Sequence, residues 1–229
     1  MARSLNISQL RTQCRQRADF EPGGASGVFV TDSEIDQYIN NSLAALYELI
    51  IDTHGELYFS SSSVFSTVVG TDAYALPADF FRLISLELTD GNATWLARQF
   101  PYQERMRYRS YPNTPFEESY GYVLQPSTVI LLPSPQQVLT ATLRYIPDPP
   151  IISGATTFNF YGGWEEWLIA DVAIKLYAKE ESDPSVFLLE RQQQEARIRA
   201  NAPKRDDVGP AVIADTVTAS RRARMWGWR

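Results

Sequence analysis

The stretch TDSEIDQYINNSLAALYELI, residues 31–50, decides the fold. Its first four residues predict a capping box, in which the Thr31 hydroxyl accepts a hydrogen bond from the Glu34 amide while the Glu34 side chain reaches back. Beyond them, side chains suited to a buried face recur at the 3.6-residue period of an amphipathic helix: Ile35, Tyr38, Ile39, Ser42, Leu43, Leu46, Tyr47 and Ile50. Gly55 supplies the usual glycine stop. A long amphipathic helix therefore anchors a helical region.

A second helical region follows Gly162-Gly163. It is apolar almost all round, and its single polar stripe consists of Asp171, Lys175 and Lys179, four residues apart. A helix of this kind has to be covered on several sides, and we expect neighbouring subunits to supply part of that cover. The subunit-interface residues predicted here are Trp164, Trp167, Asp171 and Lys175.

Two further helices are expected on either side of these. One runs from Ser4 to Ala18, with Cys14 as a small buried residue on its apolar face. The other runs from Ser185 to about Ala200, has a polar second half, and is ended by Pro203. His54 stands at the end of the long helix, where the helix dipole favours it.

Between the two helical regions the sequence changes to strand-like patterns. Stretches of alternating or β-branched residues run from about Leu57 to Ile152, and turn signals separate them. Asp90-Gly91 between two such stretches indicates a hairpin. We expect a small antiparallel domain of five to seven strands, interrupted by one short helix from Pro101 to Tyr108.

The predicted fold class is thus α+β: a helical bundle with an inserted small antiparallel β domain and an extended C-terminal arm. Residues 1–56 and 160–200 form the helical, ring-forming domain. Residues 57–159 form the inserted β-rich domain, and residues 201–229 form the arm.

The charge of the chain is uneven. The net charge is −6, but residues 201–229 contain six basic and three acidic residues, whereas the first 200 contain 15 basic and 24 acidic. An acidic body disfavours general nucleic-acid binding, which needs clustered lysine and arginine. The basic end also has apolar side chains whose burial against a partner is favourable, so we expect it to dock on another protein through Arg221, Arg222, Arg224, Met225, Trp226, Trp228 and Arg229.

The sequence offers little for catalysis, and we expect no enzyme and no cofactor. The single cysteine excludes an intrachain disulfide and a cysteine-based zinc site. Neither a phosphate-binding Gly-x-x-x-x-Gly-Lys nor a Gly-x-Ser-x-Gly motif is present. Adjacent carboxylates such as Glu165-Glu166 point about 100° apart on a helix and favour solvated faces. No apolar run approaches the roughly 20 residues of a membrane span, and the N-terminus lacks a signal-peptide core, so a soluble, intracellularly made protein is expected.

An alternative function belongs to a different class. Five tyrosines between Tyr102 and Tyr122 stand near Arg105, Arg107 and Arg109. Such a stretch is typical of surfaces that stack on bases or sugars, so a β-domain binding module for sugar or peptide is the competing interpretation. It requires these aromatic side chains to be exposed, whereas packing of a small β core buries many of them.

The order of these parts resembles that of the head-to-tail adaptor proteins of tailed bacteriophages, including the tail tubular protein A type. The resemblance covers nearly the whole chain and rests on loose motifs in a fixed order. They are the capped helix from Thr31, then YALPADFFRL (residues 74–83), LLPSP (131–135), YIPDPP (145–150), the apolar helix after Trp164 and the polar helix before the C-terminus.

This resemblance implies a structural role at the head–tail junction of a virion. The family forms rings, usually of twelve subunits, beneath the portal protein, and the opposite face receives a tail nozzle or a further connector. The genome passes through the ring during ejection, close to the protein but without specific contacts. Assembly would take place in the host cytoplasm without a membrane partner. Subunit number, tail type, host, the state before assembly and the surface that lines the channel stay open, and there are no family catalytic residues to transfer.

Overall fold

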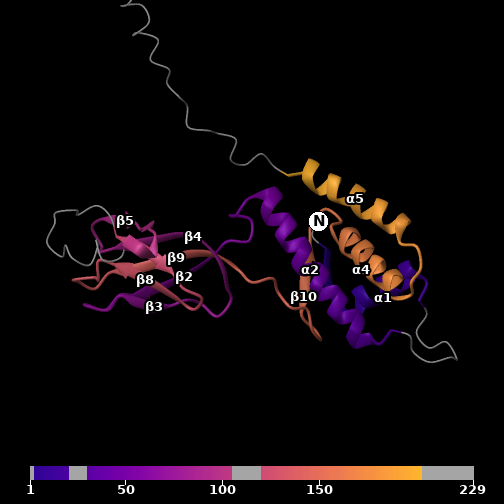
Figure 1. Cartoon of the computed structure of the whole chain (residues 1–229), viewed down its shortest axis with the longest axis horizontal. Coiled ribbons are helices and arrows are strands. Elements are labelled where there is room, and N and C mark those ends of the chain that lie inside the picture. Colours follow the sequence, from indigo (N-terminus) through magenta and orange to yellow (C-terminus); the bar gives the residue numbers. More distant parts are fainter. Residues whose placement is uncertain (1–2, 21–29, 105–119, 203–229) are drawn as a thin grey trace, which may run out of the picture.

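The computed structural model describes residues 3–20, 30–104 and 120–202. Within them the chain is an α+β protein with helices at one end of an elongated molecule and two small sheets at the other (Figure 1). The predicted fold class is confirmed at this level. No helix of the described part is long and apolar enough to cross a membrane.

In the described part of the chain, four α-helices make up the helical part: α1 (Ile7–Ala18), α2 (Asp32–His54), α4 (Glu165–Lys179) and α5 (Ser185–Ala200). Helix α4 lies against the other three. Its buried side chains join the apolar faces of α1 and α2 in one core, to which α5 contributes Ile198. The 31–54 helix predicted from the sequence is therefore present, with Thr31 and Gly55 as its caps.

A short ribbon precedes α1. Strand β1 (Arg3–Asn6) pairs antiparallel with β10 (Thr157–Phe160), and Phe158 and Phe160 pack in the helical core. The helix predicted from Ser4 is thus wrong in its first turn. Residues 3–6 find their hydrogen-bond partners about 150 positions later in the chain, and Asn6 instead caps a helix that starts at Ile7.

Within the described ranges, the β part consists of eight short strands in two four-stranded sheets. One sheet has the order β2-β9-β4-β5 and is antiparallel throughout, and the other has the order β3-β8-β7-β6, with its β6–β7 pair parallel. Their bounds are β2 (Ser61–Ser66), β3 (Ala73–Ala75), β4 (Phe80–Thr89), β5 (Thr94–Leu96), β6 (Arg98–Gln99), β7 (Gly121–Leu124), β8 (Thr128–Leu132) and β9 (Thr140–Pro147). Buried side chains from both sheets form one shared core.

The strand count exceeds the predicted five to seven because β3, β5 and β6 are two or three residues long, too short to show alternation. The hairpin at Asp90-Gly91 is present between β4 and β5. Of the helix predicted from Pro101 to Tyr108, Tyr102–Glu104 form a 3-10 turn, η1, and residues 105–108 lie outside the described ranges.

A small apolar cluster joins the two parts. It contains Tyr47 and Ile51 of α2 and Ile146 of β9, with Phe59 and Ile84 packed against them. The end of α2 thus contributes side chains both to the helical core and to the contact with the sheets.

Candidate functional site

The centre of the helical part is a buried carboxylate on α4. Asp171 is 6% exposed. Its Oδ2 accepts hydrogen bonds from the Ser42 hydroxyl at 2.8 Å and forms an ion pair with Lys175 Nζ at 2.9 Å, while its Oδ1 accepts one from Arg191 at 2.7 Å. One carboxylate therefore links α2, α4 and α5.

The charge on Asp171 is stabilised by these partners. Burial by itself raises the pKa of a carboxyl group, but hydrogen bonds from Lys175, Arg191 and Ser42 outweigh burial and lower the pKa of Asp171. The group stays ionised, and Lys175 also donates to the Ser42 hydroxyl at 2.7 Å. Asp171 and Lys175 were expected from the sequence, whereas Ser42 and Arg191 were not. The only signal for Ser42 was a hydroxyl within an otherwise apolar face.

The two tryptophans of the predicted interface lie inside their own subunit. Trp164 is 7% and Trp167 6% exposed. The Trp164 ring packs against His54 and Tyr58, with centroid distances of 5.1 and 5.8 Å. The contact of Trp164, Trp167, Asp171 and Lys175 with a neighbouring subunit stays a prediction, but a need for apolar cover is no reason for it, because α1, α2 and α5 supply that cover.

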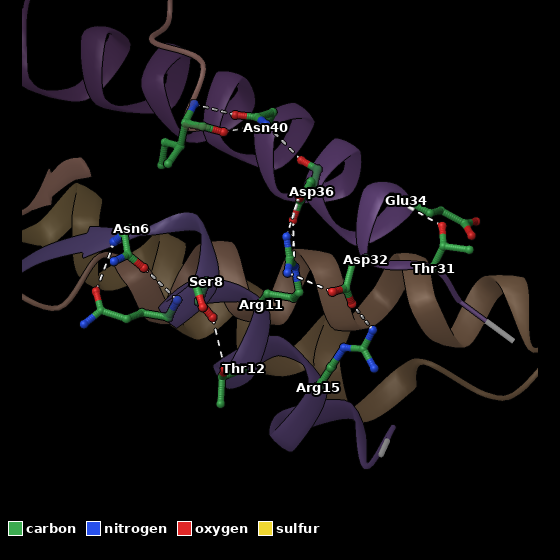
Figure 2. A network of polar contacts seen from close by, with 12 residues as sticks. Asn6, Ser8, Arg11, Thr12, Arg15, Thr31, Asp32, Glu34, Asp36 and Asn40 are labelled. Carbon is green, nitrogen blue, oxygen red and sulfur yellow. Dashed lines mark hydrogen bonds and ion pairs between the residues drawn. The ribbon is translucent and has the colours of Figure 1, made fainter. Parts of the chain in front are cut away.

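A second charged network fastens α1 to the start of α2, as Figure 2 shows. Arg11 donates to both carboxylate oxygens of Asp36, at 3.0 and 2.7 Å, and to Asp32 at 2.9 Å. Arg15 also donates to Asp32. Since bidentate arginine–carboxylate pairs fix geometry as well as adding energy, the angle between the two helices is set by charge as well as by packing.

The capping box at Thr31 is only half formed. The Thr31 hydroxyl accepts the Glu34 amide at 3.2 Å, as predicted. The Glu34 carboxylate does not reach back, because it accepts hydrogen bonds from Lys179 at 2.7 and 2.6 Å and from the Tyr38 hydroxyl at 2.9 Å. The bonds from Lys179, and next that from Tyr38, lower the pKa of Glu34. Glu34 thus bonds to Lys179 on α4 and not to the backbone amide of Thr31.

Helix α2 contains five acidic residues and neither lysine nor arginine. The three in its first turns are paired with cations of α1 and α4, as described above. Glu48 and Asp52, on the exposed face near the β part, form no ion pair with any residue in the described ranges. The second half of α2 therefore presents negative charge to solvent that no described cation pairs with.

The tyrosine-rich segment is only partly described. Tyr120 and Tyr122 are half-buried against the β core, and burial raises the pKa of both. Tyr102 is 48% exposed, whereas Tyr108, Tyr111 and Arg105, Arg107 and Arg109 lie outside the described residues. The described tyrosines thus serve mainly in packing.

The single cysteine and the single histidine, whose side chains could take part in chemistry, are buried in the core. Cys14 is fully buried, as predicted, and burial raises its pKa to about 12. His54 is buried between Tyr58 and Trp164. The described residues contain no cluster of histidine, cysteine or acidic side chains that could hold a metal ion.

The predicted docking arm cannot be placed. Arg221, Arg222, Arg224, Met225, Trp226, Trp228 and Arg229 lie outside the residues that the structure describes.

The fold and the site together define an α+β protein whose helical core is braced by ion pairs and whose small β part is joined to one of its helices. A family model describes that type more closely: the SU10 adaptor protein matches residues 5–218. The chain belongs to this adaptor family, which confirms the resemblance to phage head-to-tail adaptors and favours a structural role over an enzymatic one.

Other comparisons add less. A chain from the neck of an empty gene transfer agent particle, computed with C6 symmetry, is 12% identical, and the match covers 85% of this protein and 94% of that chain with a TM-score of 0.26. At this TM-score the two chains share no demonstrable overall arrangement. No curated protein matches the sequence.

Proposed function

We propose that this protein is a structural adaptor of a phage particle, forming a ring that joins the portal protein to the tail and surrounds the DNA channel. The observation that carries the proposal is the match to an adaptor family over residues 5–218. The ring contains twelve subunits, lies at the head–tail junction and is assembled in the host cytoplasm.

Each part of the chain has a role in this proposal. The helical part forms the ring wall, and the β part receives the tail nozzle or the next connector. The sequence placed the end of the inserted domain at residue 159, but Ile152, Phe158 and Phe160 pack in the helical core. We therefore propose that the inserted domain ends near Asp148.

Ion pairs within the wall suit this role. Asp171 fixes α4 to α2 and α5, and Arg11 fixes α1 to α2. Removing a partner of the buried Asp171 carboxylate costs about 3–5 kcal/mol, so α4 resists sliding past α2 and α5. The Arg11–Asp36 pair is partly exposed and contributes less. A ring that transmits force between capsid and tail needs such rigid subunits.

The channel is lined, in this proposal, by the exposed face of α2. Glu48 and Asp52 carry negative charge that no described cation neutralises. Like charge repels the phosphate backbone and reduces sticking of the genome as it slides through.

The C-terminal arm docks on the portal. Its arginines pair with acidic portal surface, and Trp226 and Trp228 fill apolar pockets. The described core ends at residue 202, so removal of residues 203–229 leaves every contact described above in place.

The decisive experiment removes residues 203–229 and measures binding to the portal protein of the same virus by electron microscopy and sedimentation. We expect the truncated protein to fold with an unchanged unfolding midpoint and to lose portal binding. A full-length variant with Trp226→Ala and Trp228→Ala separates the aromatic anchors from the arginines. Undiminished docking of the truncated protein would disprove the role of the arm.

A further inference from the structure

The sheet β2-β9-β4-β5 has two free edges among the described residues. Strand β2 forms one edge over six residues, and β5 forms the other over three. Free edges carry unpaired backbone groups that invite pairing with another chain, and proteins usually protect them with lysine, proline or a bulge. Strand β2, SSSVFS, has no charge and no proline, and its pairing with β9 is regular.

One row of side chains crosses this sheet from edge to edge. Val64 on β2 lies opposite Thr142 on β9, Thr142 opposite Glu87 on β4, and Glu87 opposite Leu96 on β5. Residues directly opposite one another share a face, and here it is the face turned away from the core, which Leu88, Ala141 and Leu143 occupy. The two ends of the row are apolar and exposed: Val64 is 62% and Leu96 57% exposed.

At both ends of this row, the backbone amide and carbonyl groups also point away from the sheet. The amide of Thr67 donates to Leu139 at 2.8 Å, toward the interior of the sheet, and backbone direction alternates along a strand, so the amide and carbonyl of Val64 face the free edge. On the other side, the amide of Ala97 donates to Leu86 at 2.8 Å, so the backbone groups of Leu96 face the other free edge. Each edge thus offers, at the same residue, an apolar side chain and backbone groups that no described strand pairs with.

We propose that edge β2 of one subunit pairs with edge β5 of the next, so that the sheet continues from copy to copy around the ring. This inference rests on the proposed ring and names one of its contacts. The occupant is a second copy because both halves of the contact, Val64 and Leu96, lie at the two ends of one row of the same sheet. The four antiparallel strands alternate in direction, so a rotation about an axis along the strands brings β2 of the next copy antiparallel to β5. Two different edges make a head-to-tail contact, the kind that closes a ring.

Cross-linking tests this contact directly. The variant Val64→Cys with Leu96→Cys is assembled as full-length protein with the portal protein, and treated with a bismaleimide of about 8 Å reach, which spans direct and diagonal cross-strand separations. The native Cys14 is fully buried and contributes no background. We expect a ladder of covalent multimers on a denaturing gel. Each single cysteine variant, and the mismatched pair Leu96→Cys with Val186→Cys, give no ladder.

A proline substitution tests whether the edge is needed. Val64→Pro removes an outward-facing amide and leaves the bonds between β2 and β9 in place, so we expect a folded protein whose cross-linked ladder, with Leu96→Cys and Ser66→Cys, is lost. Val64→Thr keeps the amide and the branched side chain and retains the ladder. Rings that form without a ladder from the Val64→Cys and Leu96→Cys pair would overturn this inference alone, whereas absence of rings from the wild-type chain with portal would overturn the proposed ring as well.

Discussion

The hydroxyl of Tyr47 on α2 donates a hydrogen bond to the carbonyl oxygen of Pro147, 3.1 Å away and at the end of β9. The same ring stacks on Phe59, with centroids 4.2 Å apart. Burial, the first cause, and the nearby carboxylates of Asp148 and Asp79 raise the pKa of Tyr47 to about 12. One side chain thus connects the helical part to both segments through which the chain enters and leaves the sheets.

We predict that Tyr47→Phe loosens this junction while leaving its apolar packing intact. Loss of one buried hydrogen bond costs about 1 kcal/mol, so the urea midpoint should fall accordingly. Tyr161→Phe, at a position 45% exposed, is the control and should leave the midpoint unchanged. An unchanged midpoint for Tyr47→Phe would show that this hydrogen bond does not stabilise the junction.

We predict that Asp171→Asn destabilises the helical part by about 3 kcal/mol, because Lys175 and Arg191 lose the charge that compensates them. Thermal unfolding measures the loss. Glu195→Gln breaks an exposed pair with Arg199 and should cost less than about 0.5 kcal/mol. Equal effects of the two variants would contradict the central role of Asp171.

The same carboxylate makes a prediction about pH. Its pKa is lower in the folded protein than in the unfolded chain, so its contribution to stability is complete above the unfolded value of about 3.9 and is lost as pH falls through the lower folded value. The wild-type protein should therefore lose stability below about pH 4 more steeply than Asp171→Asn. Parallel acid-unfolding curves would argue against this coupling.

We predict that Cys14 resists thiol reagents in the folded protein. The side chain is fully buried and its pKa is raised to about 12, so access and thiolate are both lacking. A disulfide reagent that releases a coloured product should label one thiol per chain only after the protein is unfolded in urea. Fast labelling of the native protein would show that the α1 face opens.

We predict that Glu48→Lys with Asp52→Lys slows DNA ejection several-fold from assembled particles. Positive charge on the exposed face of α2 would attract phosphate and add friction. Glu180→Lys, at the C-terminal cap of α4, with Glu195→Lys on α5 makes the same charge change outside that face and should leave the rate unchanged. If both pairs of substitutions act alike, α2 does not line the channel.

Local sequence signals predicted the positions of the helices well, but they did not predict which residues contact one another across the fold. The Thr31 cap and the periodic face of α2 depend on residues within a few positions of each other, and both are present. Glu34, by contrast, bonds to Lys179, which is 145 residues away in sequence, and Arg3–Asn6 is a strand only because Thr157–Phe160 lies beside it. Long-range pairing of this kind leaves no period in the sequence.

The network around Asp171 shows the same contrast between local signals and long-range contacts. Periodicity placed Asp171 and Lys175 on one stripe of α4, but it could not show that Arg191 of α5 completes their network. Nor could it show that α4 is covered by its own subunit. Composition alone indicated the basic, tryptophan-bearing arm, and its residues lie beyond the described ranges.

Among the described residues, the helical core contains none from positions 61–147, and the shared core of the two sheets contains none from outside them. In this part of the chain the two hydrophobic cores meet at the cluster around Tyr47, Ile51 and Ile146. The β part can therefore be exchanged for a module of a different shape without repacking the helical part. Substitutions in one part can therefore accumulate independently of the other, because each hydrophobic core keeps its own packing partners.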